Sequence, residues 1–374
     1  MKEHSDLLAR VPEPELCGMW LTWHCFVGYC MIELEESLAA SDRAIEIGEE
    51  CGSARVLAYA YTQRGWAFGI SGRSSGGLAA NEKALALVGQ LDDDRDARYV
   101  RLKAGCGGVF GRLSIGDLIK ARAQAQELMD FAATSGSARA LAFAYWSSAG
   151  ISYFTGDVAR AIKDAERARD AAVDPFYKSF IEPFVGLFLA SAGQYAASKA
   201  VTDSGLRFTE DRGIFSLTLQ HRLSEALVLL GEGELSRGMD QLEEIKREAH
   251  ELDWGWLHTV ARLNEAVVYA RIASGEAKTS IGAMARNLSF VIGRARGASR
   301  TAREALASLS EDLSPDLESL RFIIEFEFAK LLIKRKERDE ARRHVQKAIA
   351  FLQPLGDSVG MRNARALLAT LDAR

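Results

Sequence analysis

The segment Ala149-Gly150-Ile151-Ser152-Tyr153-Phe154-Thr155-Gly156-Asp157 holds the pattern from which an architecture can be worked out. An apolar stretch ends there at a glycine, and the small residue Ala149 lies seven positions before that glycine. The segment Gly65-Trp66-Ala67-Phe68-Gly69-Ile70-Ser71-Gly72 repeats the arrangement, with Gly65 in the place of Ala149. Glycine at such a junction permits the tight or left-handed backbone that ends one helix and starts the next. Both segments therefore predict a hairpin of two closely packed helices.

Glycines in the same setting recur at spacings of 44, 40, 37, 40 and 42 residues. They are Gly72, Gly116, Gly156, Gly193, Gly233 and Gly275. Small or apolar residues follow each of the first five glycines by five and twelve positions, which lie on one face of a helix. Two further units, near residues 33–44 and 338–348, lack the glycine but keep this downstream pattern. The sequence therefore predicts an all-α, right-handed superhelical solenoid of about eight hairpins, and no alternating run indicates a strand.

One unit of the array is irregular. After Gly275, the polar residues Ser280 and Asn287 stand where apolar side chains are expected, and the next unit begins about sixty residues later. We therefore expect three parts. Residues 1–275 form the first seven repeats, residues 276–310 form an irregular basic helical insertion, and residues 311–374 form a C-terminal hairpin with a capping helix.

The pattern of small residue, turn glycine and alanine resembles the tetratricopeptide repeat. The stretches Gly297–Leu306, Leu331–Arg342 and Asn363–Ala369 are similar to the carboxyl end of a group of bacterial regulators. These multidomain proteins combine a class III adenylate or guanylate cyclase domain, a P-loop ATPase domain and terminal helical repeats. The present chain has no GxxxxGK motif followed by Ser or Thr, and no strands to carry a cyclase's metal-binding aspartates. The resemblance therefore implies the regulatory repeat region and no catalytic residue.

Composition excludes several classes of protein. The chain of 374 residues is 48% hydrophobic and 26% charged, which is typical of folded proteins, and its net charge of −4 does not favour nucleic acid or anionic lipid as a partner. The apolar stretch Cys17–Ile32 is shorter than the roughly 20 residues that span a membrane. The acidic N-terminal region is unlike a signal peptide. We expect a cytoplasmic protein without a membrane partner, in which the five cysteines are free thiols.

The first helix of each hairpin should line the concave face of the solenoid, which is the usual binding surface of such arrays. The residues predicted there are Met19, Phe26, Trp66, Ile70, Phe110, Trp146, Tyr153, Phe154, Leu187 and Tyr269. This aromatic lining suits a protein segment, a peptide or a small effector held by ring stacking. The alternative is that the same rings form the core. Only Lys103 and Arg262 add positive charge in consecutive central units, so we do not expect a clamp for carboxylates.

A basic segment offers a second candidate surface. Arg296, Arg300 and Arg303 share one helical face within a stretch that lacks acidic residues. They form either a site for an anionic partner or a solvated face balanced by the acidic residues from Glu304 to Glu318.

Metal, cofactor and catalytic signatures are not predicted. Cys17, His24, Cys25 and Cys30 carry the right ligand types for zinc, but their spacing scatters them over several faces of one helix. The glycines of residues 105–111 lack the third glycine and the preceding strand of a dinucleotide-binding fingerprint. No HExxH or GxSxG motif is present.

Two functional hypotheses follow. The first is a helical-repeat module that binds a protein, peptide or small effector in its concave face and regulates a signalling output of the cyclase or ATPase type. The second is the sensor region of a transcriptional regulator whose DNA-binding domain lies elsewhere. An enzyme built on a helical solenoid is a third class, for which no site is evident in the sequence.

Overall fold

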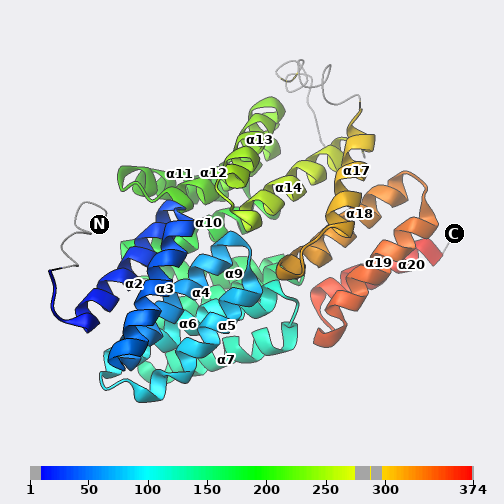
Figure 1. The fold of residues 1–374 in the computed structure, drawn as a ribbon. Coiled ribbons are helices and arrows are strands. Elements are labelled where there is room, and N and C mark those ends of the chain that lie inside the picture. The colour runs from blue at the N-terminus through cyan, green and yellow to red at the C-terminus, as the bar shows by residue number, and fades with distance from the viewer. Residues whose placement is uncertain (1–9, 274–286, 288–296, 373–374) are drawn as a thin grey trace.

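The computed structural model describes residues 10–273, 287 and 297–372, and within them the chain is helical with no strand. The helices pack in consecutive pairs (Figure 1). The pairs are α2 (Pro14–Met31) with α3 (Leu34–Cys51), α4 (Ala54–Ser71) with α5 (Ser74–Ala86), α6 (Asp94–Ser114) with α7 (Leu118–Ser135), α8 (Ala138–Phe154) with α9 (Val158–Ala171), α10 (Pro175–Ser191) with α11 (Tyr195–Asp211), α12 (Phe215–Gly231) with α13 (Leu235–Glu251), α14 (Gly255–Ala273) with α17 (Ala298–Glu311), and α18 (Arg321–Lys334) with α19 (Arg338–Leu352). The last described helix, α20 (Val359–Asp372), packs on α19. The 3-10 segments of the described residues are η2 (Val88–Gln90), η4 (Pro315–Leu320) and η5 (Gln353–Leu355). The predicted all-α solenoid of about eight hairpins is confirmed.

Each hairpin turn that the structure describes has the left-handed backbone that the glycines predicted. Five of those glycines have φ between 77° and 86°. Ile32 (φ 61°) and Lys336 (φ 64°) take the same conformation in the two units without glycine. A left-handed residue with a Cβ atom costs roughly 1–2 kcal/mol, so the packing of these two hairpins must offset that strain. Gly275 lies outside the described residues.

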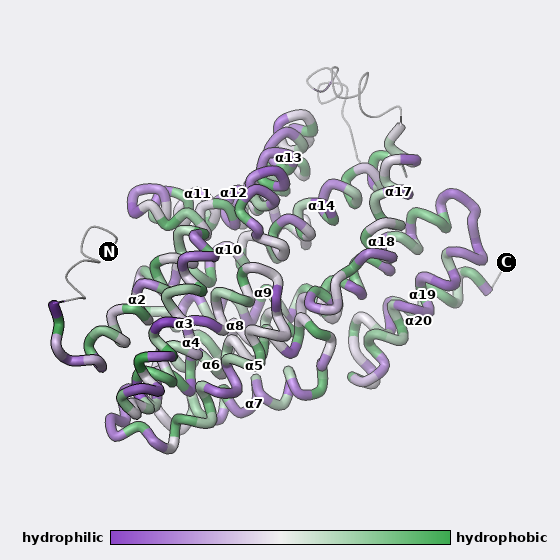
Figure 2. Tube along the Cα trace, in the orientation of Figure 1, coloured by the Kyte–Doolittle hydropathy of each residue, from purple (hydrophilic) through white to green (hydrophobic). Residues whose placement is uncertain are grey.

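The second helix of each pair buries one face and exposes the other. In α13 the buried residues are Leu235, Gly238, Met239, Leu242, Ile245 and Ala249, which follow helical spacing. The small or apolar residues that follow each of the first five turn glycines by five and twelve positions were predicted to share one helix face, and all of them are buried. Hydrophilic stretches are prominent on α13 and α19 (Figure 2). None of the helices among the described residues combines the length and the apolar character needed to cross a membrane.

The described part of the predicted insertion consists of Asn287 and of α17 with the preceding Gly297, and α17 packs against α14 and α18. The Asn287 side chain is buried, and its Nδ2 donates a hydrogen bond of 2.7 Å to the Gly233 carbonyl. Its Oδ1 accepts one of 3.2 Å from the Ser236 backbone N–H, so Asn287 satisfies a free donor in the first turn of α13. Ser280 lies outside the described residues.

The superhelix turns back on itself, so that the hairpin turns of its N-terminal half contact its C-terminal half. We call this contact the seam. A Cβ atom on Gly72 would lie 3.2 Å from the Trp256 backbone nitrogen, and one on Gly156 would lie 2.9 Å from the Gly360 Cα atom. The Ser75 backbone N–H donates a hydrogen bond of 2.9 Å to Asp316 Oδ1 across the same contact. Glycine at these turns thus serves the close approach of a distant segment as well as the turn itself.

Candidate functional site

Three aromatic residues predicted for the concave face meet inside the superhelix. Trp66 of α4 and Trp146 of α8 are stacked with ring centroids 5.9 Å apart and planes inclined by 23°. The ring centroid of Phe110 in α6 lies 5.0 Å from that of Trp146, and the ring centroid of Phe184 in α10 lies 5.4 Å from it. The first helices of four consecutive hairpins therefore contribute to one aromatic cluster.

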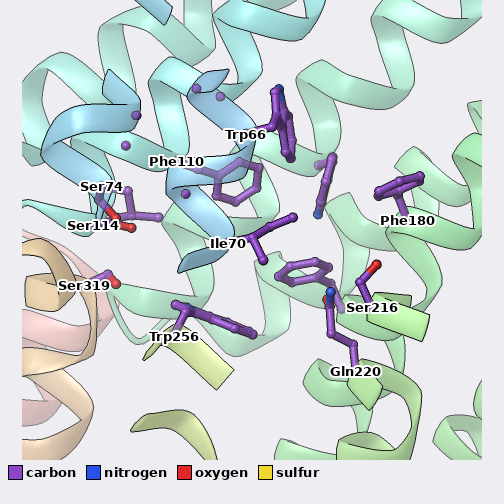
Figure 3. Close-up of a pocket in the computed structure, with 18 of the residues that line it drawn as sticks. Trp66, Ile70, Ser74, Phe110, Ser114, Phe180, Ser216, Gln220, Trp256 and Ser319 are labelled. Atoms are coloured by element: carbon purple, nitrogen blue, oxygen red, sulfur yellow. The ribbon is translucent and has the colours of Figure 1, made fainter. Parts of the chain in front are cut away.

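This cluster borders a cavity of about 130 Å³, which we call the aromatic cavity. Its aromatic lining consists of Trp66, Phe110, Trp146, Phe154, Phe180, Phe184, Trp254 and Trp256. Serines and Gln220 supply the polar part of the wall, and Figure 3 shows Trp66, Phe110 and Trp256 around the hollow with Ser216 and Gln220. None of the described residues that line it is ionisable. The wall therefore favours uncharged, flat groups.

A larger cavity of about 520 Å³, which we call the main cavity, lies further along the inner face. Helices α8, α10, α12, α14, α18 and α20 all contribute to its wall. The wall is mainly apolar but includes Arg271 and Glu327. The two cavities share Phe154 and Trp256, so they are neighbouring parts of one interior.

Tyr153 supplies a hydroxyl to the wall of the main cavity. That hydroxyl shares a hydrogen bond of 3.0 Å with Ser191 Oγ, and the Tyr153 ring is stacked on Phe188 at 4.4 Å between centroids. Burial raises the pKa of Tyr153, and the Ser191 hydrogen bond opposes part of that shift. The phenol is therefore a neutral hydrogen-bonding group at physiological pH.

The predicted site residues divide into those that line a cavity and those that do not. Trp66, Ile70, Phe110, Trp146 and Phe154 line the aromatic cavity, and Tyr153, Phe154 and Leu187 line the main cavity. Met19 packs instead against a small separate core around Tyr59 and Val100. Tyr269 is buried in the main core and lines neither cavity.

Four aromatic residues of the aromatic cavity are not among the sequence predictions. Phe180 and Phe184 lie on α10, while Trp254 and Trp256 stand at the start of α14. The turn-glycine pattern points to positions near the end of each first helix. Trp254 and Trp256 lie at the opposite end of their helix, and only the seam brings them to the cavity.

Lys103, predicted on the inner face, is buried in a cage of aromatic rings. Its Nζ lies 4.2 Å from the Phe26 centroid, 5.5 Å from Tyr29, and 5.9 Å from both Trp66 and Tyr99. Burial lowers the pKa of Lys103 to about 7. Arg262 donates a hydrogen bond of 3.1 Å to Ser308 Oγ. Neither side chain is arranged as a clamp for a carboxylate.

The basic face of α17 is paired with carboxylates. Arg303 lies 3.1 Å from Glu337 and 2.8 Å from Glu340, measured between nitrogen and oxygen atoms. Arg300 lies 3.9 Å from Glu304. Arg296 lies outside the described residues. An anionic partner at this face would have to compete with these carboxylates.

The four zinc-type ligands of α2 do not converge. Cys25 Sγ contacts Ser37 Oγ at 3.2 Å, and the His24 ring packs against Trp20 at 5.1 Å between centroids. Across the described ranges, no three His, Cys, Asp or Glu side chains form a group that could hold a metal ion. Burial raises the pKa of Cys25 to about 11 and that of Cys30 to about 12, so both thiols stay protonated.

Comparison with solved structures supports the architecture. A Rap protein complexed with Competence and Sporulation Factor is similar with a TM-score of 0.51 and 10% identity, covering 95% of this chain and 98% of that chain. The human IFIT1 dimer with PPP-AAAA has a TM-score of 0.48 and 11% identity, covering 92% and 69%. A signal transduction ATPase with a tetratricopeptide repeat sensor from Pyrococcus horikoshii has a TM-score of 0.41 and 12% identity, covering 92% and 54%. The chain has a tetratricopeptide-like fold.

No protein-family model matches the sequence, and no curated protein is similar to it in sequence. At 10% identity, the likeness to the Rap protein concerns the fold alone.

Proposed function

We propose that this protein is a helical-repeat sensor that binds a short peptide or small effector in the main cavity. The observation that carries the proposal is the size and position of that cavity. Its volume of about 520 Å³ lies within the roughly 300–1,000 Å³ range of ligand pockets. Helices from α8 to α20 contribute to its wall, so an occupant would touch hairpins that are distant in sequence. The Rap protein, which shares the fold, is complexed with Competence and Sporulation Factor.

The chemistry of the wall supports a ligand with apolar side chains and polar ends. Aliphatic and aromatic side chains dominate, while Asn264 and Asn363 offer amide groups that both donate and accept hydrogen bonds. Arg271 adds a positive charge, and Glu327, which pairs with Lys330 at 2.8 Å, adds a carboxylate. A short peptide with free ends carries both signs as well, so it fits this wall better than a polyanion does.

Binding is proposed to regulate a signalling output, without catalysis by this chain. The output would belong to a cyclase or ATPase domain, as the resemblance of Gly297–Leu306 and the two later stretches implies. A DNA-binding output domain is the alternative, and the domains encoded beside this chain distinguish the two. We place the module in the cytoplasm, because all five cysteines are free thiols.

The test is retention of peptides by the purified chain. A synthetic library of unblocked pentapeptides is incubated with the protein, and the peptides that co-elute in size-exclusion chromatography are identified by mass spectrometry. Asn363→Trp narrows the main cavity at an exposed position of α20 and should abolish retention. Arg365→Trp, at an exposed position of α20 outside the wall, is the matched control and should retain the same peptides. The proposal fails if the unmodified chain retains no peptide, or if both variants retain peptides equally.

A further inference from the structure

The aromatic cavity differs in chemistry from the main cavity. Four of the six tryptophans of the chain line it, together with four phenylalanines. Among the described residues of its wall there is no Asp, Glu, Lys, Arg or His. A charged ligand would lose its hydration there without gaining a partner, so the wall excludes ions.

The size of this cavity sets the size of an occupant. Its volume of about 130 Å³ is close to the roughly 150 Å³ of an apolar protein cavity known to hold benzene. A single aromatic ring with a small substituent therefore fits, whereas a peptide does not. Rings on several sides of the cavity offer the stacked and edge contacts that aromatic ligands prefer.

One residue of this wall carries a buried polar atom that has no partner among the described residues. The Trp146 side chain is 3% exposed, and its Nε1 has no hydrogen-bond partner among the described residues. By contrast, Trp66 Nε1 donates a hydrogen bond of 3.1 Å to the Lys103 carbonyl. A buried donor without an acceptor costs about 1–3 kcal/mol, so an acceptor brought by a ligand is stabilised at this point.

We propose that the aromatic cavity is a second binding site, specific for a neutral single-ring aromatic compound that carries a hydrogen-bond acceptor. The ring lies among the tryptophans and phenylalanines, and the acceptor takes the N–H of Trp146. An aryl ketone, an aryl aldehyde or a benzamide has this chemistry. The site is distinct from the one proposed for a peptide, because its volume and polarity differ and the two cavities share only Phe154 and Trp256.

The test uses two ligands of nearly equal shape. Acetophenone carries a carbonyl oxygen where α-methylstyrene carries a methylene group, so only acetophenone accepts a hydrogen bond. Isothermal titration calorimetry on the full chain measures the affinity of each compound. We expect both compounds to bind with one-to-one stoichiometry.

Two tryptophan variants isolate the Trp146 N–H. Trp146→Phe removes the donor and part of the ring. It should lower the affinity for acetophenone by a factor about five to ten times larger than the factor by which it lowers the affinity for α-methylstyrene. Trp256→Phe removes an equal part of another ring of the wall and should change both affinities by the same factor. The comparison between ligands cancels any general loosening of the cavity.

Three results would overturn the proposal. The first is the lack of saturable binding of either compound to the unmodified chain. The second is a Trp146→Phe variant in which the affinities for both ligands fall by the same factor. The third is loss of acetophenone binding in Asn363→Trp, which would place the compound in the main cavity. Failure of the peptide experiment leaves all three measurements unaffected, so the two proposals are judged separately.

Discussion

The Lys103 ammonium donates a hydrogen bond of 2.8 Å to the Tyr29 hydroxyl and so joins α6 to α2 across 74 residues of sequence. Tyr29 donates in turn to Gln63 Oε1 at 3.1 Å, and Gln63 Nε2 donates to the Tyr99 hydroxyl at 2.8 Å. Three consecutive first helices are thus linked by one chain of hydrogen bonds. The rings around Lys103 offset part of its burial cost through cation–π attraction.

The burial of Lys103 should make the free energy of unfolding rise with pH. Its pKa falls from 10.5 to about 7 on folding, so above about pH 7 the unfolded chain binds more protons than the folded one. We expect a gain of up to about 3 kcal/mol between pH 7 and 9, measured by urea unfolding. Above pH 9 the buried thiols Cys30 and Cys106, whose pKa is raised to about 12, act in the opposite direction.

Lys103→Met should remove this pH dependence. The variant keeps most of the side-chain volume, and Tyr29 keeps its hydrogen bond to Gln63. At pH 6 we expect it to be more stable than the unmodified chain, by an amount that shrinks as pH rises. The exposed Lys163→Met is the control and should show the unmodified pH profile. A Lys103→Met variant that is less stable at every pH would contradict this account.

His221 should make the protein sensitive to acid. The side chain is fully buried in α12, neither ring nitrogen has a partner among the described residues, and burial lowers its pKa to about 4. Between pH 6.5 and 4 the unfolded chain takes up a proton that the folded chain does not, so stability falls as pH falls, by up to about 3 kcal/mol. His221→Leu lacks this titration. The free energy of unfolding of the variant, relative to that of the unmodified chain, should therefore rise by up to about 3 kcal/mol as the pH falls from 6.5 to 4. An unchanged difference would mean that His221 titrates normally.

Two glycine-to-alanine substitutions inside helices should have opposite signs. A Cβ on Gly205 of α11 would collide with the His221 imidazole, whereas one on Gly69 of α4 meets no atom of the described residues within 4 Å. Gly205→Ala should therefore destabilise the protein by about 1–3 kcal/mol through overpacking. Gly69→Ala should stabilise it by up to about 1 kcal/mol, the difference in helix propensity. Thermal unfolding of the two variants provides the measurement, and a loss of stability in both would contradict the geometry at Gly69.

The seam can be tested at Gly360. A Cβ there would collide with the Thr155 carbonyl in the turn between α8 and α9. Gly360→Ala should therefore raise hydrogen exchange both in α20 and in that turn, although about two hundred residues separate them. Gly89→Ala, where a Cβ meets nothing within 4 Å, should leave both regions protected. Faster exchange confined to α20 would show that the two segments are not coupled.

The local features of the fold could be predicted because local backbone physics sets them. The turn glycines were recognisable since left-handed backbone favours glycine, and the same logic cannot detect Ile32 or Lys336, where packing overrides the preference. Repeat spacing placed Trp66, Phe110 and Trp146 on one predicted face, but it did not predict that their rings contact one another. Whether those rings face a ligand or fill the core remained open in the sequence, and the structure places them at a cavity wall with Trp146 itself buried.

Features that depend on long-range closure could not be predicted. Trp256 reaches the aromatic cavity only because the superhelix brings α14 beside α4, and no periodicity encodes that contact. Repeat spacing placed Lys103 on the inner face, but it could not show that aromatic rings of neighbouring first helices enclose its ammonium group. The partners of Arg303 lie on another hairpin, so the charge balance of α17 could not be assigned from nearby residues either.

In an open solenoid each repeat touches only its neighbours, so its end repeats fray independently and its unfolding follows a one-dimensional chain of coupled units. The contact between Ser75 and Asp316 joins the second hairpin to the segment that leads into the eighth, six places further along that chain. Melting of the last hairpin therefore removes support from the second, and the usual tolerance of repeat arrays to shortening is lost. A substitution that destabilises the last hairpin should therefore also destabilise hairpins in the N-terminal half.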